Sequence, residues 1–599
     1  MLNFALAGIF TNLAEIQKGK DGNFERVMEF TKAARTVRDY TGDIAGAYSN
    51  GTVRYLPGIS DNIYKMISEY FDTGKITEYE MVKERYPEDL LKFIRISGLG
   101  KRRVFKIYDV LGLKSLEDLK TCVSDKSIHK KIYEKSRDFL QDNIPVTESN
   151  IGRLVFSLEY FEKTKNLYPK GYTDFFIEKI LNPLQNFQGI NSVIQTGSLR
   201  RKKSFIADMD FLVLPDFNLK EFNPDKSIKI LKDLQSLSFI KSIGKIDSRK
   251  FNVSARYSTV FGIDMEIIIT SGNRYHLDLF TTTGNKKHVG QMLDVYNERK
   301  VSCEEAINAE SIKTGKIIEE RSDSIIYDSI GIQYIPPELR EGNDEIELAS
   351  GFLLPDLIDY GDIKGDMHIH SEWSDGLLTM EDIFSFCRRN NYQYFALSDH
   401  TISNEYGNGL GQERFIKKIK YVEDLRRTVE DISILLGAEV DITGVGRLDY
   451  DTELLRGVDF VLGSMHSSYL NSKQENTSRV VSALENKHLD AIAHPTGVVF
   501  GSRAPYQLDM DTILQKAQEN NKALEINSYL LRLDINEVLA RQFRQIGGKM
   551  VINTDSHRAD NLAMIKLGVE VARRAGLKKD DVLNTMTLPE IKEWRRSRL

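Results

Sequence analysis

The sequence predicts a multidomain protein whose fold changes along the chain from helical, through α+β, to α/β. Apolar residues recur at helical spacing over the front quarter of the chain, and short β-branched runs such as DFLVLP follow in the middle. From residue 363 onward, apolar runs alternate with helix-like stretches, which is typical of a mostly parallel sheet. A length of 599 residues allows about three to five domains. We expect four regions, at residues 1–150, 151–340, 341–362 (an acidic linker) and 363–599.

Composition and charge narrow the class of protein. Hydrophobic residues make up 41% and charged residues 28%, which is ordinary for a globular protein and excludes wholesale disorder. Residues 1–300 hold 47 basic and 38 acidic side chains, whereas the remainder holds 35 and 49. We therefore expect contact with a polyanion in the front half and metal chemistry in the back half.

Cysteine content and hydropathy indicate the compartment. The three cysteines, Cys122, Cys303 and Cys387, are too far apart to form a disulfide framework or a thiolate zinc site. No apolar run approaches the roughly 20 residues that cross a bilayer. We expect a cytoplasmic protein without a membrane segment, and a first helix from the apolar stretch MLNFALAGIF.

An internal repeat of about forty residues occupies the front region. In each copy an apolar residue leads into a glycine turn and then an amphipathic helix: the first copy holds Gly58 and Ser60, and the second holds Gly98 and Gly100. Such a turn exposes backbone N–H groups, and the following helix dipole also favours an anion. An ordinary corner between two helices is the alternative. The basic residues Lys101 and Arg102 directly after the second turn favour contact with a phosphate backbone.

Three acidic residues mark the middle region. Residues 206–213 are expected to form a strand, whose alternation puts Asp208 and Asp210 on one face about 6.5–7 Å apart. Asp264 lies in a second apolar run and would add a carboxylate from a neighbouring strand. Upstream, Gly197 and Ser198 precede a basic cluster that suits a triphosphate. An Asp-x-Asp pair alone is weak evidence, but this order of features favours a site that holds two metal ions.

Seven of the ten histidines lie after residue 363, and six of these lie at or just past the end of an apolar run. In a (β/α) barrel the carboxyl ends of the strands face one another, so residues far apart in sequence converge there. Imidazole and carboxylate donors together suit Zn²⁺ or Mn²⁺. A lone histidine at a strand end is usually structural, but six in register with seven predicted strands indicate a metal centre. The histidines are His368, His370, His400, His466, His494 and His557, and two further runs end at Glu439 and Asn527.

This last region resembles the polymerase and histidinol phosphatase (PHP) domain. The resemblance implies a distorted seven-stranded (β/α) barrel that hydrolyses phosphoesters with up to three Zn²⁺ or Mn²⁺ ions. Arg503 and Arg532 are candidate phosphate contacts, with ordinary surface arginines as the alternative. The nine metal ligands that the resemblance implies are His368, His370, Asp375, His400, Glu439, His466, His494, Asp555 and His557.

The middle region resembles the nucleotidyltransferase palm of the X-family DNA polymerases, and YIPPELR (residues 334–340) resembles the end of the bacterial X-family core. The resemblance implies that Asp208 and Asp210 bind two Mg²⁺ or Mn²⁺ ions, while Asp264 holds the catalytic ion and helps to activate the primer 3′-hydroxyl. Two features depart from the family: Ala207 replaces a glycine, and threonines replace the Tyr-Phe pair before Gly284. The implied contacts to the incoming nucleotide are Gly197, Ser198, Arg201, Gly284 and Asn285.

The front repeats resemble helix-hairpin-helix motifs, which grip DNA without reading its sequence. With the palm and the PHP domain in this order, the resemblance implies a monomeric DNA polymerase that fills short gaps during base-excision repair, using gapped or primer–template DNA and dNTPs. Its barrel would act as a 3′-5′ exonuclease or as a phosphoesterase that trims damaged 3′ ends. One alternative is a phosphoesterase tethered to DNA, with a weak or vestigial polymerase. Another is a DNA-binding scaffold without activity, which nine retained ligands disfavour because buried charges without a partner are costly.

Overall fold

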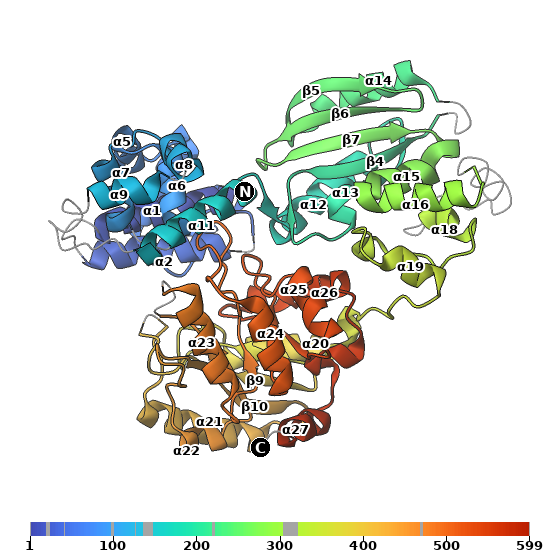
Figure 1. Ribbon diagram of the computed structural model, residues 1–599. Helices are drawn as coiled ribbons and strands as arrows, with labels where there is room; N and C mark the ends of the chain where they lie inside the picture. Colours follow the sequence, from blue (N-terminus) through green and yellow to red (C-terminus); the bar gives the residue numbers. More distant parts are fainter. Residues whose placement is uncertain are drawn as a thin grey trace. The chain divides into compact units, whose positions relative to one another are not determined.

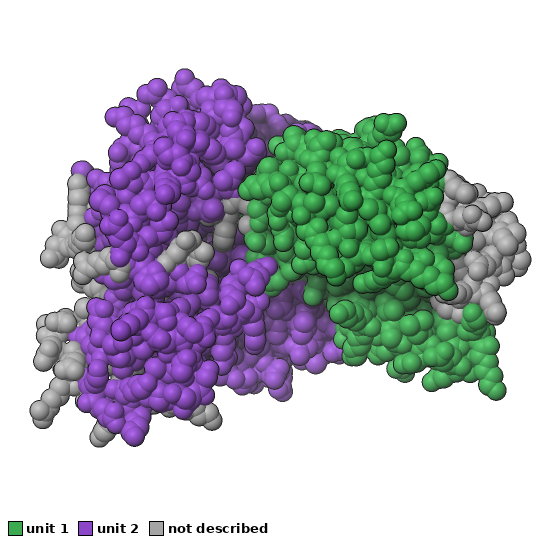
Figure 2. Space-filling view, turned by 90° about the horizontal axis from the view of Figure 1, so that it is seen from above, with its two compact units in different colours: residues 1, 167–360, 569–579 green, residues 2–166, 361–568, 580–599 purple. Residues whose placement is uncertain are grey.

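The computed structural model describes residues 2–18, 24–40, 42–97, 101–125, 127–135, 148–217, 222–302, 322–405, 407–467 and 471–597. The chain divides into two compact units, coloured separately in Figure 2. The first unit comprises residues 167–360 and 569–579, and the second comprises residues 2–166, 361–568 and 580–599. Among the described residues, we find no helix with the length and apolar character needed to cross a membrane.

The front of the second unit is helical, as the apolar spacing predicts. Its helices bury one apolar face each in a common core, to which α1, α2, α6 and α11 contribute Phe10, Phe30, Phe93 and Leu154. Leu2–Lys18 forms the predicted first helix. The helices are α1 (Leu2–Lys18), α2 (Phe24–Asp39), α3 (Ile44–Ser49), α4 (Asp61–Thr73), α5 (Thr77–Arg85), α6 (Glu88–Ser97), α7 (Lys101–Leu111), α8 (Leu116–Ser124), α9 (Ile128–Glu134) and α11 (Glu148–Thr164).

A five-stranded sheet in the order β2-β4-β7-β6-β5 forms the centre of the first unit, and Figure 1 shows β5, β6, β7 and β4 side by side. The sheet is mixed because β4 and β7 pair in parallel, whereas the other neighbours are antiparallel. The strands are β2 (Ile190–Thr196), β4 (Met209–Pro215), β5 (Ile240–Ser248), β6 (Asn252–Thr259) and β7 (Asp264–Thr270). The helices are α12 (Lys170–Gln185), α13 (Gly197–Arg200), α14 (Pro224–Asp233), α15 (Tyr275–Thr283), α16 (Lys286–Glu298), α18 (Ile325–Asp328) and α19 (Glu345–Ser350).

The single strand predicted over residues 206–213 is wrong in detail. Phe205–Ile206 forms β3, which pairs with β1 (Tyr168–Pro169) in a separate two-stranded sheet. The chain bends at Ala207 and Asp208 before β4 begins at Met209. Because β3 and β4 belong to different sheets, the backbone has to turn between them, and Asp208 lies in that bend rather than inside a strand.

Seven parallel strands form the barrel of the second unit, in the order β14-β13-β12-β11-β10-β9-β8. A parallel bridge between Ile369 and Ser556 links the first strand to the segment after the last, so the sheet nearly closes. Helices surround the strands, as Figure 1 shows for β9 and β10. The strands are β8 (Gly365–Ile369), β9 (Tyr394–Leu397), β10 (Ser433–Asp441), β11 (Phe460–Ser464), β12 (Ala491–Ile492), β13 (Ala523–Asn527) and β14 (Met550–Asn553). The helices are α20 (Met380–Arg389), α21 (Gln412–Thr428), α22 (Thr452–Arg456), α23 (Lys473–Leu484), α24 (Met510–Glu519), α25 (Glu537–Gln545), α26 (Ile565–Arg574, which continues into the first unit) and α27 (Leu588–Arg596).

The predicted fold class is confirmed: a helical front, a mixed sheet and a C-terminal barrel of seven parallel strands. Strands such as β9 and β14 are buried on every residue, as expected where helices cover a parallel sheet. This arrangement brings the carboxyl ends of all seven strands to one end of the barrel.

Candidate active sites

The nine predicted metal ligands of the barrel converge at the carboxyl ends of its strands. His368 and Glu439 lie on β8 and β10, and the other seven lie in the segments that follow β8, β9, β11, β12 and β14. Three overlapping groups have ligand atoms that all lie within 4.8 Å of one another. The groups are His370, Asp375, His400 and His557; His368, His370 and Asp555; and His400, Glu439 and His466.

Glu439 lies at the centre of the cluster. Its Oε2 is 2.7 Å from His400 Nδ1, and its Oε1 is 2.8 Å from His494 Nε2 and 3.3 Å from His466 Nε2. Its side chain is fully buried. One carboxylate therefore faces histidines from three other strand ends.

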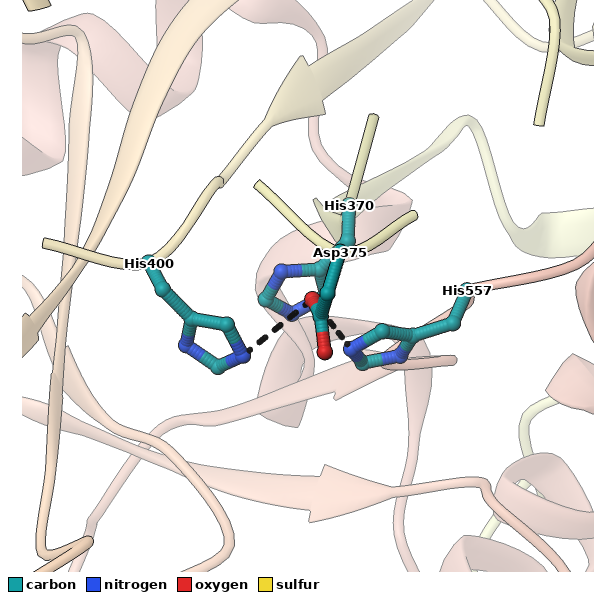
Figure 3. A group of neighbouring side chains, drawn as sticks. All are labelled: His370, Asp375, His400 and His557. Atoms are coloured by element: carbon teal, nitrogen blue, oxygen red, sulfur yellow. Dashed lines mark ion pairs between the residues drawn. The ribbon is translucent and has the colours of Figure 1, made fainter. Parts of the chain in front are cut away.

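Asp375, like Glu439, is a carboxylate that faces several histidines, and it lies at the edge of the cluster. Figure 3 shows His400 and His557 approaching its carboxylate, with His370 alongside. Asp375 Oδ1 is 3.2 Å from His557 Nε2 and 3.6 Å from His400 Nε2. Asp375 comes from the loop after β8, so this group combines one loop carboxylate with three strand-end imidazoles.

The donor set fits divalent metal ions. Buried ligand atoms such as His368 Nε2, Glu439 Oε2 and Asp375 Oδ1 lie close to other ligand atoms but form no hydrogen bond of good geometry within the described part of the chain. Buried polar atoms almost always have partners, so a cluster of such atoms facing one another indicates that ions complete the site. Nitrogen and carboxylate donors together are the ligands of zinc and manganese sites.

The histidines of the cluster differ in the direction in which their surroundings shift the pKa. Burial and neighbouring imidazoles lower the pKa of His370 to about 3, and burial with Arg532 lowers the pKa of His494 to about 4. Both rings are thus neutral at neutral pH, which is the form that binds a metal. Burial also acts to lower the pKa of His466, but Glu439 and Asp441 raise it to about 10. In this ion-free arrangement the carboxylates of Glu439 and Asp441 therefore pair with a protonated His466.

The two candidate phosphate contacts lie in different surroundings. Arg532 lines the same cavity as the histidines, of about 290 Å³, and its Nε is 3.3 Å from Asp555 Oδ2. Arg503 donates from Nε to the carbonyl of Gly497 at 2.6 Å and stacks over the Tyr506 ring. Of the pair, only Arg532 lines this cavity among the described residues.

The palm acids lie at the start of two neighbouring strands. Pairing in register joins Met209 to Met265 and Asp210 to Glu266, so Asp208 and Asp264 precede the first pair on each strand. Asp208 accepts from Arg256 Nη2 at 3.1 Å, and Asp264 accepts from Ser258 Oγ at 3.1 Å. These acids form none of the groups with ligand atoms within 4.8 Å among the described residues.

A fourth acid, Glu266, contributes to the charge of the palm. Burial, Asp208 and Glu266 raise the pKa of Asp210 to about 7. Burial also raises the pKa of Asp208, against the lowering effect of Arg256. Cations would relieve this repulsion between carboxylates, so the palm acids also fit divalent ions.

Gly197 is packed directly against Asp210. Its φ is +59°, and a Cβ at this position would lie 1.9 Å from Asp210 Oδ2. Only glycine tolerates both the conformation and the close approach. The glycine turn predicted from the sequence thus brings the backbone of α13 against Asp210.

Two predicted nucleotide contacts share one partner in the first unit. Arg201 Nε is 3.1 Å from Glu341 Oε1, and Asn285 Nδ2 donates to Glu341 Oε2 at 3.0 Å. Between them in sequence, Gly284 has a φ of +68° and ends α15. Ser198 is half-buried in α13. Arg201, Gly284 and Asn285 are therefore neighbours, with an acidic side chain holding two of them.

Of the two hairpins, the first can be described. Gly58 has a φ of +85°, and a Cβ there would lie 2.9 Å from Thr36 Oγ1, so this turn requires glycine. Ser60 caps α4 by accepting from the backbone N–H of Ile63. Gly98 and Gly100 lie outside the described residues, and Lys101 and Arg102 begin α7.

Comparison with known proteins identifies the family. The PHP domain model matches residues 366–531. The DNA polymerase/3′-5′ exonuclease PolX of Bacillus subtilis (strain 168) is 30% identical over 586 residues, which cover 98% of this chain and 98% of that protein. This chain belongs to the PolX family.

The PHP part also has shorter relatives. A probable phosphatase of Acetivibrio thermocellus is 30% identical over 32% of this chain and 78% of its own length. The crystal structure of a histidinol phosphate phosphatase from Lactococcus lactis is 19% identical, with a TM-score of 0.28, and the match covers 36% of this chain and 94% of that one. Of these three relatives, the PolX of Bacillus subtilis is the one whose match extends over the palm and the helical front.

The structure adds residues to both sites of this PolX-family chain that the sequence analysis missed. Glu525 Oε1 is 2.7 Å from His368 Nδ1, and Asp441 Oδ2 is 3.2 Å from His466 Nδ1. Each carboxylate thus contacts Nδ1 of its histidine, while Nε2 of the same ring faces the ligand cluster. A charged residue inside a fully buried strand, as Glu525 is in β13, was the signal that could have revealed it. Glu266, Arg256 and Glu341 of the palm were also missed.

We expect Glu525→Gln to weaken the barrel centre without removing a predicted ligand. Carboxylates that orient ligating histidines typically change metal affinity or activity by about 10- to 100-fold when replaced. Metal titration and phosphodiester hydrolysis should both show a loss in this range. Glu519→Gln, at the exposed end of α24, is the matched control and should change neither. Unchanged metal affinity in Glu525→Gln would contradict its orienting role.

Proposed function

We propose that this protein is a DNA polymerase that fills short gaps during repair and carries a 3′-5′ exonuclease in its barrel. The observation that carries the proposal is the similarity to PolX along 98% of both chains, since it includes the palm as well as the barrel. The convergence of nine potential ligands at one end of the barrel supports the exonuclease part.

In this proposal the nine barrel residues would hold up to three Zn²⁺ or Mn²⁺ ions, and Arg532 would orient a substrate phosphate from the wall of the same cavity. Divalent ions held at either site would supply Lewis acidity that neutralises charge on the reacting phosphoryl group. Buried partners such as Glu525 would keep the ligand rings in place and in one tautomer.

In the palm, Asp208 and Asp210 would hold two Mg²⁺ or Mn²⁺ ions, and Asp264 would help to activate the primer 3′-hydroxyl. The incoming dNTP would lie against the turn at Gly197, with Ser198, Arg201, Gly284 and Asn285 as its contacts. The close approach of the α13 backbone to Asp210 supports this arrangement, because it joins the phosphate-binding turn to the acidic pair.

The helical front would bind gapped or primer–template DNA through Gly58, Gly98, Gly100, Lys101 and Arg102. Hairpins that grip the phosphate backbone would make this binding independent of sequence and weaker at higher salt. We place the protein in the cytoplasm as a monomer, with functional regions at 1–150, 151–340 and 363–599 and the connecting segment at 341–362.

A second candidate is a DNA-tethered phosphoesterase with weak polymerase activity. The threonines at 281 and 282, and the absence of a tight acid group in the described palm, favour it. The variant Asp555→Ala, which removes a predicted barrel ligand, distinguishes between the two candidate functions. We expect this variant to fill a one-nucleotide gap without shortening the primer, and failure to incorporate any nucleotide would support the phosphoesterase.

We expect weak discrimination between dNTPs and rNTPs. Thr281 and Thr282 supply no aromatic wall against the sugar, and a pocket that only tolerates an added hydroxyl rejects it by about 10²-fold at most. Single-nucleotide incorporation kinetics with both substrates measures this ratio. Thr281 is exposed, so Thr281→Tyr can be accommodated and should raise the preference for dNTPs. A preference well above about 10²-fold in the unmodified protein would count against this prediction.

A further inference from the structure

Helix α2 of the helical front contributes to the wall of the barrel metal centre. Both belong to the second compact unit. Arg35 and Arg38, one turn apart near the end of α2, line the cavity of about 290 Å³ that also contains Asp375, His400 and His557. Together with Arg532, which also lines the cavity, these two arginines supply the positive charge expected where an anionic substrate binds.

The contact between the two regions is specific. Arg35 Nη1 lies 3.0 Å from Asp375 Oδ2. The other oxygen of the same carboxylate, Oδ1, faces His557 and His400 at 3.2 and 3.6 Å. Arg35 therefore holds one oxygen of Asp375 while the second is left to the histidine group.

Asp375 is the ligand that most needs such a partner. It lies in a loop between β8 and α20, whereas the other ligands lie on strands or within a few residues of a strand end. The backbone of this loop is well fixed: Ser371 and Ser374 both donate to the buried Asp399, and a Cβ at Gly376 would lie 2.3 Å from the carbonyl of His370. The orientation of the Asp375 side chain then depends on Arg35 and the histidines.

The packing of α2 fixes Arg35 in place. Its apolar face, including Phe30, Ala33 and Val37, is buried in the core of the helical front. The same core includes Ala504 from the barrel, whose carbonyl accepts from Arg153 Nη2 at 2.8 Å. Because the helical front and this barrel loop share one core, the Arg35–Asp375 pair is more than a chance contact of two surface chains.

We infer that Arg35 is a positioning residue of the barrel centre, so that this centre is completed by a residue 340 positions away in sequence. A guanidinium presents its donors in a rigid fork and stays charged, which suits it to orient a carboxylate. The Arg35 side chain is 42% exposed, and ion pairs at such positions add little to stability. Its loss should therefore disturb Asp375 rather than the fold. The inference rests on the proposed metal-dependent function of the barrel.

Full-length Arg35→Gln tests this inference. Titration of Mn²⁺ into the metal-free protein should show binding of one ion weakened by about ten-fold, within the range for partners of metal ligands. The turnover rate of the exonuclease at saturating DNA should fall by a similar factor, while the KM for DNA stays within about two-fold. Arg35→Lys, which keeps the charge, should recover part of both losses.

Arg26→Gln is the matched control. Arg26 also lies on α2, pairs with the carboxylate of Glu78 and has a side chain that is 39% exposed. Wild-type Mn²⁺ affinity in Arg35→Gln would overturn the inference, as would an equal loss in Arg26→Gln. A change confined to the KM for DNA would also overturn it, since Arg35 would then hold substrate instead of Asp375. If the unmodified protein has no exonuclease activity but Arg35→Gln still weakens Mn²⁺ binding, the proposed function fails and the positioning role stands.

Discussion

Replacing His370 with alanine should abolish exonuclease activity and leave gap filling intact. His370 belongs to two of the three ligand groups in the barrel, so its removal disturbs two ion positions at once. Its Nε2 is 3.1 Å from Asp555 Oδ1, and its ring stacks on His557 with centroids 4.0 Å apart. Losing about 4 kcal/mol of charge stabilisation in the transition state lowers the rate about 10³-fold.

Removal of nucleotides from a labelled primer measures this loss, and incorporation into a gapped duplex measures the palm in the same preparation. His488→Ala is the matched control, since it removes another buried imidazole of the barrel outside the three groups. Circular dichroism should show both variants folded. Equal losses of exonuclease activity in the two variants would mean that barrel stability, and not the ligand, limits the reaction.

The barrel shows how far sequence patterns extend. Its strands were predictable because apolar runs ended repeatedly in His or Glu, and parallel strand ends must converge. Asp375 follows no such rule, since it lies in a loop, and only the family resemblance indicated it. Arg35 could not be found from either source, because its contact depends on how helices from the front pack against the barrel loops.

In the palm, local sequence patterns predicted the central acids but not the contacts around them. The Asp-x-Asp pattern located the acids, but the break between β3 and β4 depends on the pairing of β3 with β1, which no local pattern encodes. The pairing of Asp210 with Glu266 is likewise a matter of strand register. Partners that arise from register or from long-range packing, such as Arg256 and Glu341, were therefore missed even where the central residues were named.

Asp208→Ala should abolish nucleotide incorporation and spare exonuclease activity. Asp208 lies beside Asp264 at the start of the paired strands, so its loss removes one of the acids proposed to hold both palm ions. We expect incorporation to fall at least about 10³-fold, which corresponds to roughly 4 kcal/mol of lost charge stabilisation. Single-turnover extension of a gapped primer, compared with shortening of the same primer, gives both rates.

The fold should tolerate this change, which makes the result interpretable. Asp208 is 27% exposed and its partner Arg256 is 58% exposed, so breaking their ion pair leaves no buried charge. Asp247→Ala breaks a more exposed ion pair, with Lys245, in the same sheet and should keep both activities. If Asp208→Ala extends primers at the normal rate, the palm acids are not the polymerase centre. If it loses both activities while remaining folded, the palm and the barrel cannot be independent sites, because no palm acid belongs to the ligand groups of the barrel among the described residues.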